Sequence, residues 1–397
     1  MTTTTLDRVH PALEKLGGFS LLTGGPIHRL YLRLGLAAAP LRQIPRRTAV
    51  AITLNWVALV AIVGAEELAR THPLEAFVRD LEVHVRFLIV IPLLIAGEAL
   101  TDQRLRESLP QFNDRQLIPP EEEAHIDAVL TRAARMRDSV WAETVLLALV
   151  VVFSASVFQE RVALKAARWF GEEARVGMPL SALWYAGISM PLFQILFFRW
   201  YYRLLIWCTL LWRLAGIRLR LLPTHPDHAG GIAFLGQSLF AFAPFILAHS
   251  TLLSAMIADR LFRGATLMDF RMLLGAAFAL IVGFLVLPLL RFIPQLAQCR
   301  KRGLLEYGAL STRCMAEFDE KWRQPHACDD SLLASGNVSS VSDMASSYEL
   351  VRAMNIVPFD RSTIVGLVVL LCLPLLPLAL TLISAKEILS FGMKLIL

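Results

Sequence analysis

The segment 221–231, with the sequence LLPTHPDHAGG, holds the densest group of chemically reactive side chains in this chain of 397 residues. His225, Asp227 and His228 lie close together in it, between prolines and a Gly-Gly pair. Imidazole nitrogens and carboxylate oxygens bind transition metals, and this spacing allows two or three of them to bind one ion. A complete structural metal site would need a fourth ligand, and no partner with motif spacing lies nearby.

Two further interpretations of the same loop stay open. Asp227 would cap a helix beginning at Gly230 by accepting hydrogen bonds from its free backbone N–H groups, while His225 and His228 bond to neighbouring loops. Alternatively, the Gly230–Gly231 turn and the positive end of that helix would contact an anion or a lipid headgroup. Of the three interpretations, we favour the cap over an anion contact and a metal ligand set.

Charged residues inside apolar segments form a second group. Glu98 and Glu143 lie in segments that run antiparallel, so both carboxylates come to a similar depth in a bilayer. Such carboxylates are costly and usually face a polar interior, either in structural bonds or in a proton or cation site. Four arginines follow on one face of a predicted helix, namely Arg199, Arg203, Arg213 and Arg220. They are expected either to snorkel to lipid phosphates or to pair with the carboxylates.

We predict that these groups meet at one face of the membrane, because each unpaired buried charge costs several kcal/mol. The prediction is at least one carboxylate–arginine contact, with His225 or His228 within reach of the same cavity. His249, farther along the chain beside Ser250, is expected to bond to a neighbouring helix.

The composition indicates which elements carry these residues. The chain is 56% hydrophobic with a mean hydropathy of +0.55, above the roughly 45–50% apolar content of soluble domains. Several apolar runs reach the roughly 20 residues that cross a bilayer as a helix. The predicted fold class is therefore all-α, a polytopic transmembrane bundle of about seven spans with a small cytoplasmic helical subdomain.

The seven predicted spans cover residues 48–63, 83–100, 140–158, 180–198, 239–257, 272–292 and 363–384. The fourth apolar stretch continues to Ile217 and, as one helix, would exceed the bilayer thickness, so its last part must pack on protein, lie in the interface or break at Gly216. A helix opening at Pro119 and Pro120 is predicted to run unbroken into the third span.

Most of the 39 lysines and arginines fall in loops on one side of this arrangement. Basic loops face the cytoplasm, so the N-terminus is predicted inside and the C-terminus outside. The remaining segments are a cytoplasmic or interfacial N-terminal segment 1–47, loops 101–139 and 218–236 within the span region 48–292, a cytoplasmic helical subdomain 293–361, and an interfacial amphipathic tail 385–397.

Several stretches resemble one protein family. PDHAGG at 226–231, EYGAL at 306–310, the residues FD and KW within 318–322, and SYELV at 347–351 running to VPF at 357–359 resemble a family of uncharacterised multi-pass bacterial inner-membrane proteins. The resemblance spans most of the chain. It implies a bacterial inner membrane, and it carries over neither an activity nor any functional residue.

The composition and motifs also exclude several functions. The net charge of +6 follows from loop placement in a membrane protein, so no nucleic-acid partner is expected. Five scattered cysteines argue against a disulfide framework and a thiolate zinc site. No P-loop, HExxH, GxSxG or dinucleotide-binding glycine pattern occurs.

The function predicted first is a non-enzymatic transporter-like, channel-like or lipid-binding membrane protein with a cytoplasm-facing polar cluster. Its partners would be membrane lipids and a small ion or solute, and the sequence requires no cofactor. One alternative is a membrane-embedded, metal-dependent enzyme that acts on a lipid or small substrate through His225, Asp227 and His228. The other is an assembly partner without a site.

Overall fold

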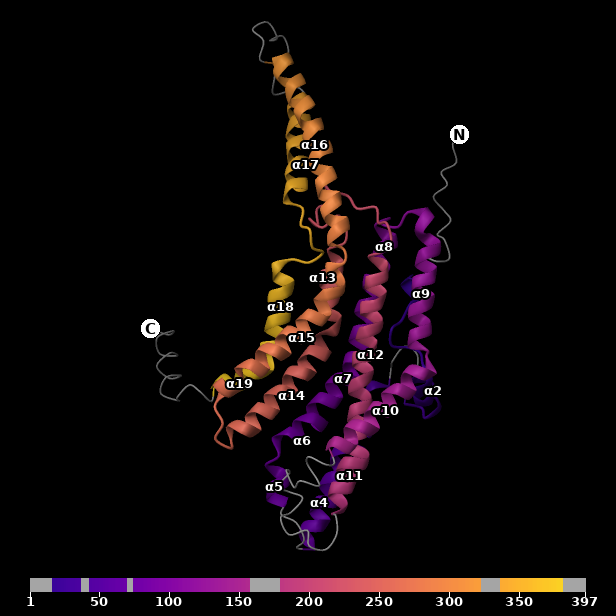
Figure 1. Ribbon diagram of the computed structural model, residues 1–397, viewed down its shortest axis with the longest axis vertical. Helices are drawn as coiled ribbons and strands as arrows, with labels where there is room; N and C mark the ends of the chain where they lie inside the picture. Colours follow the sequence, from indigo (N-terminus) through magenta and orange to yellow (C-terminus); the bar gives the residue numbers. More distant parts are fainter. Residues whose placement is uncertain (1–15, 37–42, 70–73, 158–178, 323–335, 381–397) are drawn as a thin grey trace, which may run out of the picture.

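The computed structural model describes residues 16–36, 43–69, 74–157, 179–322 and 336–380, and every regular element within them is helical. Most of the helices form a long bundle, and one helical hairpin extends beyond it at one end (Figure 1). The predicted all-α fold class is confirmed.

Six helical segments among the described residues are long and apolar enough to cross a membrane: Ile44–Leu68, Leu81–Asp114, Leu180–Leu214, Phe234–Leu261, Leu267–Leu290 and Arg361–Leu378. A bent pair, Pro120–Arg137 with Val140–Ser156, gives a seventh span if it is counted as one. All seven overlap the predicted spans, which makes this chain a multi-pass integral membrane protein.

The helices that form these spans have the following bounds. Spans one and two contain α3 (Ile44–Ile52), α4 (Ala58–Leu68), α6 (Leu81–Val85), α7 (Ile91–Ser108) and α8 (Gln111–Asp114). Spans three and four contain α9 (Glu123–Arg137), α10 (Val140–Val157), α11 (Leu180–Trp184) and α12 (Met190–Leu214). Spans five to seven contain α13 (Phe234–Ser238), α14 (Ala243–Leu261), α15 (Arg271–Leu290), α18 (Arg361–Cys372) and α19 (Leu376–Leu380).

Successive spans run in opposite directions. The chain between spans four and five (215–233), the start of α9, and the hairpin of α16 (Ile293–Trp322) and α17 (Gly336–Ala353) lie at one end of the bundle, the hairpin end. The short helix α5 (Leu74–Val78), which joins α4 to α6, lies at the opposite end (Figure 1). The loops thus alternate between the two ends, as the predicted threading requires.

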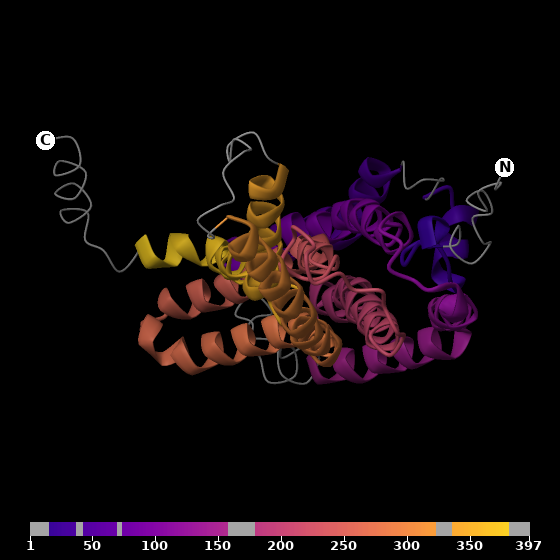
Figure 2. The same ribbon diagram turned by 90° about the horizontal axis from the view of Figure 1, so that it is seen from above.

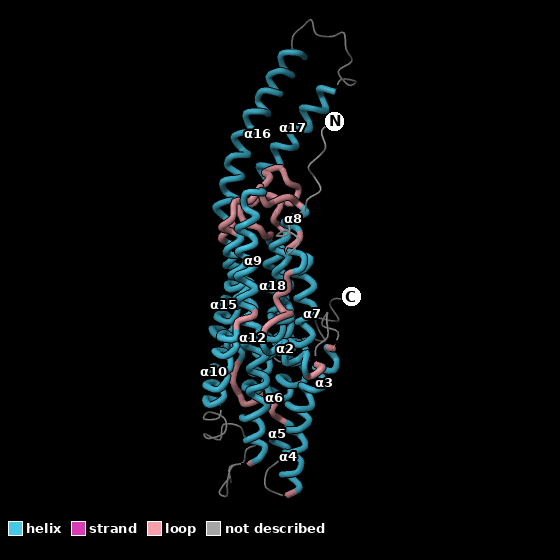
Figure 3. Tube along the Cα trace, turned by 90° about the vertical axis from the view of Figure 1, so that its right-hand side faces the viewer, coloured by secondary structure: helices cyan, strands magenta, loops and turns pink. Residues whose placement is uncertain are grey.

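The hairpin is made by two antiparallel helices that lie side by side (Figure 3). Near its base the Arg300 guanidinium of α16 donates a hydrogen bond to the backbone carbonyl of Arg352 in α17, at 3.0 Å. Farther out, a methyl group added at Gly308 would meet the Tyr348 ring at 3.5 Å. The helical subdomain predicted within 293–361 is therefore a pair of helices that pack on each other.

The third span differs from its prediction, because it does not run unbroken from the preceding helix. α9 ends at Arg137 and α10 begins at Val140, with a bend of 41° between them. Asp138 accepts a hydrogen bond from the Gly25 N–H at 2.9 Å, and the Ser139 hydroxyl accepts one from the Ala142 N–H at 3.2 Å. The long-range bond holds Asp138 where α9 ends, and the local bond of Ser139 caps α10.

The fourth span is one helical segment from Leu180 to Leu214, with one wider turn at Tyr185–Ser189. Its 35 residues would extend roughly 52 Å at about 1.5 Å per residue, more than the roughly 30 Å of hydrocarbon. The excess packs on protein, since Leu204, Leu211 and Leu214 are at most 1% exposed.

A close contact fixes spans two and five against each other. A Cβ atom added at Gly97 of α7 would lie 2.4 Å from the Pro244 Cβ of α14 and 3.3 Å from the Trp200 ring. Small residues allow this kind of backbone approach between membrane helices.

We therefore predict that Gly97→Ala forces α7 and α14 apart and destabilises the protein by about 1–3 kcal/mol. The matched control is Gly275→Ala in α15, where an added Cβ meets nothing within 4 Å and where the greater helix preference of alanine acts alone. Thermal melting of the purified variants measures the difference. A Gly97→Ala protein that melts as high as Gly275→Ala would contradict this packing.

Candidate functional site

The central group of the site is the carboxylate of Glu98 in α7, which is 2% exposed. The Arg203 guanidinium of α12 donates to its Oε1 at 2.7 Å, and the Arg47 guanidinium of α3 donates to its Oε2 at 2.6 Å. The predicted carboxylate–arginine contact is therefore confirmed. One carboxylate joins the first, second and fourth spans through two charge-assisted hydrogen bonds.

Arg199 lies one helical turn before Arg203 and is 7% exposed. Its guanidinium carbon lies 5.6 Å from the centre of the Tyr31 ring. Its Nη1 is buried and has no hydrogen-bond partner in the described part of the chain. The Arg199 side chain also lines a cavity of about 20 Å³, which is space for about one water-sized particle.

Glu143 of α10 is 8% exposed and lines the same cavity. Its two carboxylate oxygens accept the N–H of Ile27, at 3.2 Å and 2.9 Å. Ile27 lies in the first turn of α2 (Pro26–Arg33), where free N–H groups favour a negative charge. We call Arg47, Glu98, Glu143, Arg199 and Arg203 the arginine cluster.

Residues 16–36 cover this cluster. Leu21, Leu22 and Gly24 line the cavity beside Arg199. Tyr31 of α2 stacks under two arginines of the cluster, with its ring centre 4.7 Å from the Arg47 guanidinium carbon. The sequence predicted only a cytoplasmic or interfacial segment here, and its apolar and basic residues gave no signal of this covering role.

Two polar contacts hold the covering segment in place. The Arg137 guanidinium donates to the backbone carbonyl of Ser20 at 2.7 Å, and the Ser20 hydroxyl donates to the Asp102 carboxylate.

The covering segment also carries a histidine, His28. Burial, followed by the positive charge of Arg199, holds the pKa of His28 below its ordinary value. His28 is therefore expected to be neutral near pH 7 and to add no positive charge to the cluster.

The loop with His225, Asp227 and His228 forms a separate structure. The Asp227 carboxylate accepts hydrogen bonds from the N–H groups of Ala229, Gly231 and Ala233 at 2.9–3.1 Å. Burial raises the pKa of Asp227, but these N–H groups and His225 outweigh it, so the pKa lies below its ordinary value.

Of the three interpretations of this loop, the one in which Asp227 accepts backbone N–H groups describes its contacts best. The predicted helix start at Gly230 is wrong. α13 begins at Phe234, because Gly230 and Gly231 adopt positive φ angles of 65° and 102° that continue the turn. The Asp227 carboxylate also pairs with Arg115 at 3.2 Å. Its oxygens therefore fix the loop and the helix that follows it.

The two histidines do not join the arginine cluster. The His225 Nδ1 lies 2.8 Å from the Asp227 carboxylate, and the His228 carbonyl accepts the Asn355 N–H at 2.7 Å, next to α17. Neither histidine lines the cavity beside Arg199, so the prediction that one of them would reach it is wrong. Among the described residues, no group of three or more His, Cys, Asp or Glu side chains is placed to hold a metal ion.

The remaining predicted residues divide by exposure. Arg199, Arg203 and Arg213 lie on α12, where Arg213 is exposed and the other two are buried. Arg220 is exposed and lies beyond the end of α12 at Leu214, so the prediction that all four arginines share one helix face is wrong. His249 of α14 lies 2.6 Å from the Tyr201 hydroxyl of α12, which confirms the predicted bond to a neighbouring helix.

We predict that Glu98→Gln destabilises the protein by about 3–5 kcal/mol, because two buried guanidinium groups lose their counter-charge. The control is Glu75→Gln, which removes an exposed ion pair with Arg79 worth about 0–1 kcal/mol. Thermal melting of both variants against the wild type is the measurement. Equal losses from the two substitutions would show that the buried pairs do not hold the spans together.

No protein-family model matches the chain, and neither a curated protein nor a solved structure matches it. The geometry described above is therefore the basis for interpreting the site. It shows a multi-pass integral membrane protein in which a buried carboxylate and three buried arginines lie under the covering segment 16–36.

Proposed function

We propose that this chain is a non-enzymatic membrane protein of transporter or channel type that binds a small monovalent anion beside Arg199. The observation that carries the proposal is the buried Nη1 of Arg199, which has no hydrogen-bond partner in the described part of the chain. Buried polar groups in proteins nearly always have a partner, and a charged one without a partner is costly. An anion in the adjoining cavity would supply the missing acceptor.

The charges of the arginine cluster support an anion rather than a cation. Three arginines face two carboxylates, and His28 is expected to be neutral, so one positive charge remains. The Glu98 oxygens are bound by Arg47 and Arg203, and those of Glu143 by the Ile27 N–H. A cation would find the carboxylates occupied and would meet three guanidinium groups at close range.

The size of the cavity limits the identity of the anion. About 20 Å³ admits one water-sized particle, which suits a halide and excludes phosphate or a larger oxyanion.

Because Glu143 also lines this cavity, its negative charge opposes the bound anion. Glu143→Gln, which keeps an acceptor for the Ile27 N–H, is therefore expected to strengthen anion binding.

The metal-dependent enzyme and the assembly partner have no comparable support. At the loop, the Asp227 oxygens already accept three backbone N–H groups and an Arg115 contact. An ion bound there would have to replace these bonds, which hold the turn before α13.

The test is the melting temperature of purified protein in chloride against gluconate at constant ionic strength. Chloride is expected to raise it, with a stabilisation of about 2.7 kcal/mol when its concentration is 100 times the dissociation constant. Arg199→Gln should abolish the difference. Arg213→Gln, on the same helix but exposed, should keep it.

An Arg199→Gln protein that keeps the full chloride effect would overturn the proposal. Chloride flux into proteoliposomes then separates a transporter or channel from a protein that only binds the anion. Flux is expected in the wild type and in Arg213→Gln, and it is expected to be lost in Arg199→Gln.

We also propose a location in a bacterial inner membrane with the hairpin end in the cytoplasm. Its support is the sequence resemblance, together with the excess of lysines and arginines in the loops at that end. Reporter fusions after residues 330 and 397 test the orientation. A cytoplasmic signal is expected only at 330, and a cytoplasmic signal at 397 would contradict the proposed threading.

A further inference from the structure

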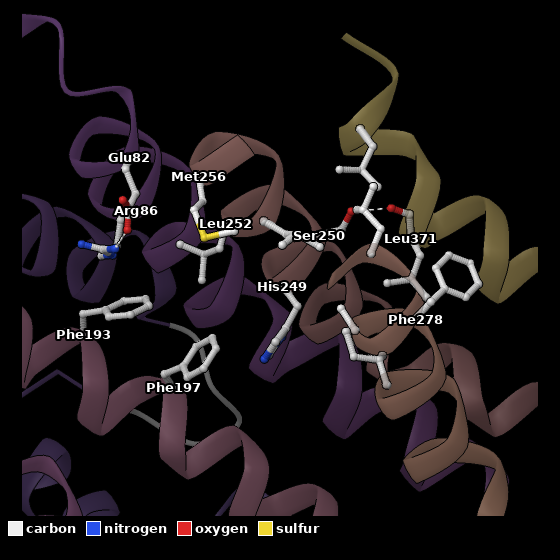
Figure 4. A pocket seen from close by; sticks show the side chains of 15 residues that line it. Glu82, Arg86, Phe193, Phe197, His249, Ser250, Leu252, Met256, Phe278 and Leu371 are labelled. Carbon is white, nitrogen blue, oxygen red and sulfur yellow. Dashed lines mark hydrogen bonds and ion pairs between the residues drawn. The ribbon is translucent and has the colours of Figure 1, made fainter. Parts of the chain in front are cut away.

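A second cavity lies within the membrane spans, away from the arginine cluster. It has a volume of about 350 Å³ and lies between α12, α14, α15 and α18 and the start of the second span. Figure 4 shows Phe193 and Phe197 on one wall, with Leu252 and Met256 of α14 and Phe278 of α15 on the others. Figure 2, a view along the bundle, shows the same separation. The yellow α18, which borders the cavity, lies on the opposite side from the indigo α2 and α3, which lie at the arginine cluster.

Most of the wall of this cavity is apolar, and its polar side chains are bonded to protein. The Ser250 hydroxyl donates to the Leu371 carbonyl, and His249 is bonded to Tyr201. Arg86 pairs with Glu82 and donates to the Tyr185 hydroxyl. Water in such a cavity would find few partners, whereas a hydrocarbon chain would gain contacts along the whole wall.

The position of the cavity indicates that its ligand comes from the lipid bilayer. α15 contributes Leu274 and Ile281 to the wall, while Leu273 and Leu280 on the same helix are 42% and 72% exposed. These exposed leucines lie in a membrane span, where the surrounding medium is lipid. The cavity is partly open rather than enclosed, and α15, which forms one of its walls, also contacts the acyl chains of the bilayer.

The ion pair gives the cavity a polar end. Glu82 and Arg86 lie at the beginning of the second span, at the end of the bundle opposite the hairpin. The beginning of a span is the part nearest the lipid headgroups. The Arg86 guanidinium carbon lies 5.5 Å from the centre of the Phe193 ring, so the ion pair borders the apolar wall there. Apolar walls with a few polar groups at one end, and a volume above about 300 Å³, are typical of ligand pockets.

We propose that this cavity binds one acyl chain of a membrane lipid, with the lipid headgroup toward the Glu82–Arg86 ion pair. The chain lies between Phe193 and Phe197 of α12 and the Leu252–Met256 turn of α14. This site goes beyond the proposed anion function and does not depend on it.

The test uses nanodiscs that contain phosphatidylcholine with a photoreactive diazirine on one acyl chain. After illumination, mass spectrometry compares the label on Leu252–Met256 with the label on Leu280, which faces the bilayer and serves as an internal reference. Wild-type protein is expected to carry label at both places. Absence of label from Leu252–Met256 in the wild type would overturn the proposal, whatever the variants do.

Two matched variants test whether the chain occupies the cavity. Ala277 lines it, whereas the neighbouring Ala276 is exposed. Ala277→Phe is expected to abolish the label at Leu252–Met256 and to keep it at Leu280, while Ala276→Phe keeps both. Label at Leu252–Met256 that persists in Ala277→Phe, or is lost equally in Ala276→Phe, would overturn the proposal, because labelling would then not depend on the space beside Ala277.

Discussion

The buried carboxylate of Glu98 is the constraint on which the rest of this structure depends. It binds Arg47 and Arg203 at 2.6 Å and 2.7 Å and thereby joins the first, second and fourth spans. In a medium of low dielectric constant, each of these charges is tolerated only with its partner in place. The positions of these three spans relative to one another are fixed around this pair of bonds. One residue before Glu98, Gly97 allows α7 to approach α14 of the fifth span closely.

The same pairing leaves the cluster with an excess positive charge and gives residues 16–36 their place. Tyr31 stacks on two of the guanidinium groups, and the N-terminal turn of α2 meets the carboxylate of Glu143. The segment closes one side of the cavity beside Arg199. The position of α2 and the proposed anion site thus both follow from one set of buried charges.

The sequence predicted the spans well, because runs of about 20 apolar residues leave few alternatives. It also predicted at least one carboxylate–arginine contact, which the structure shows between Glu98 and Arg203, since buried charges of opposite sign must meet. It did not identify Arg47, which lies at the edge of the first apolar run, where a basic residue is ordinarily explained by the cytoplasmic interface. The break at Asp138 was missed because its cause is a long-range bond to Gly25.

The loop at Asp227 shows a different limit. Its residue types fit a metal site and an anion site as well as a helix cap, and the backbone geometry, with three N–H groups directed at one carboxylate, distinguishes them. The intramembrane cavity had no sequence signal, because its lining residues come from spans far apart in the chain.

The presence of an anion beside Arg199 is tested most directly by anomalous X-ray diffraction from crystals grown in bromide. Bromide has an anomalous signal that water lacks, so the two are distinguished at the same position. The account predicts an anomalous peak within hydrogen-bond distance of the Arg199 Nη1. A cavity that holds only water, with no anomalous peak at Arg199 in saturating bromide, would contradict it.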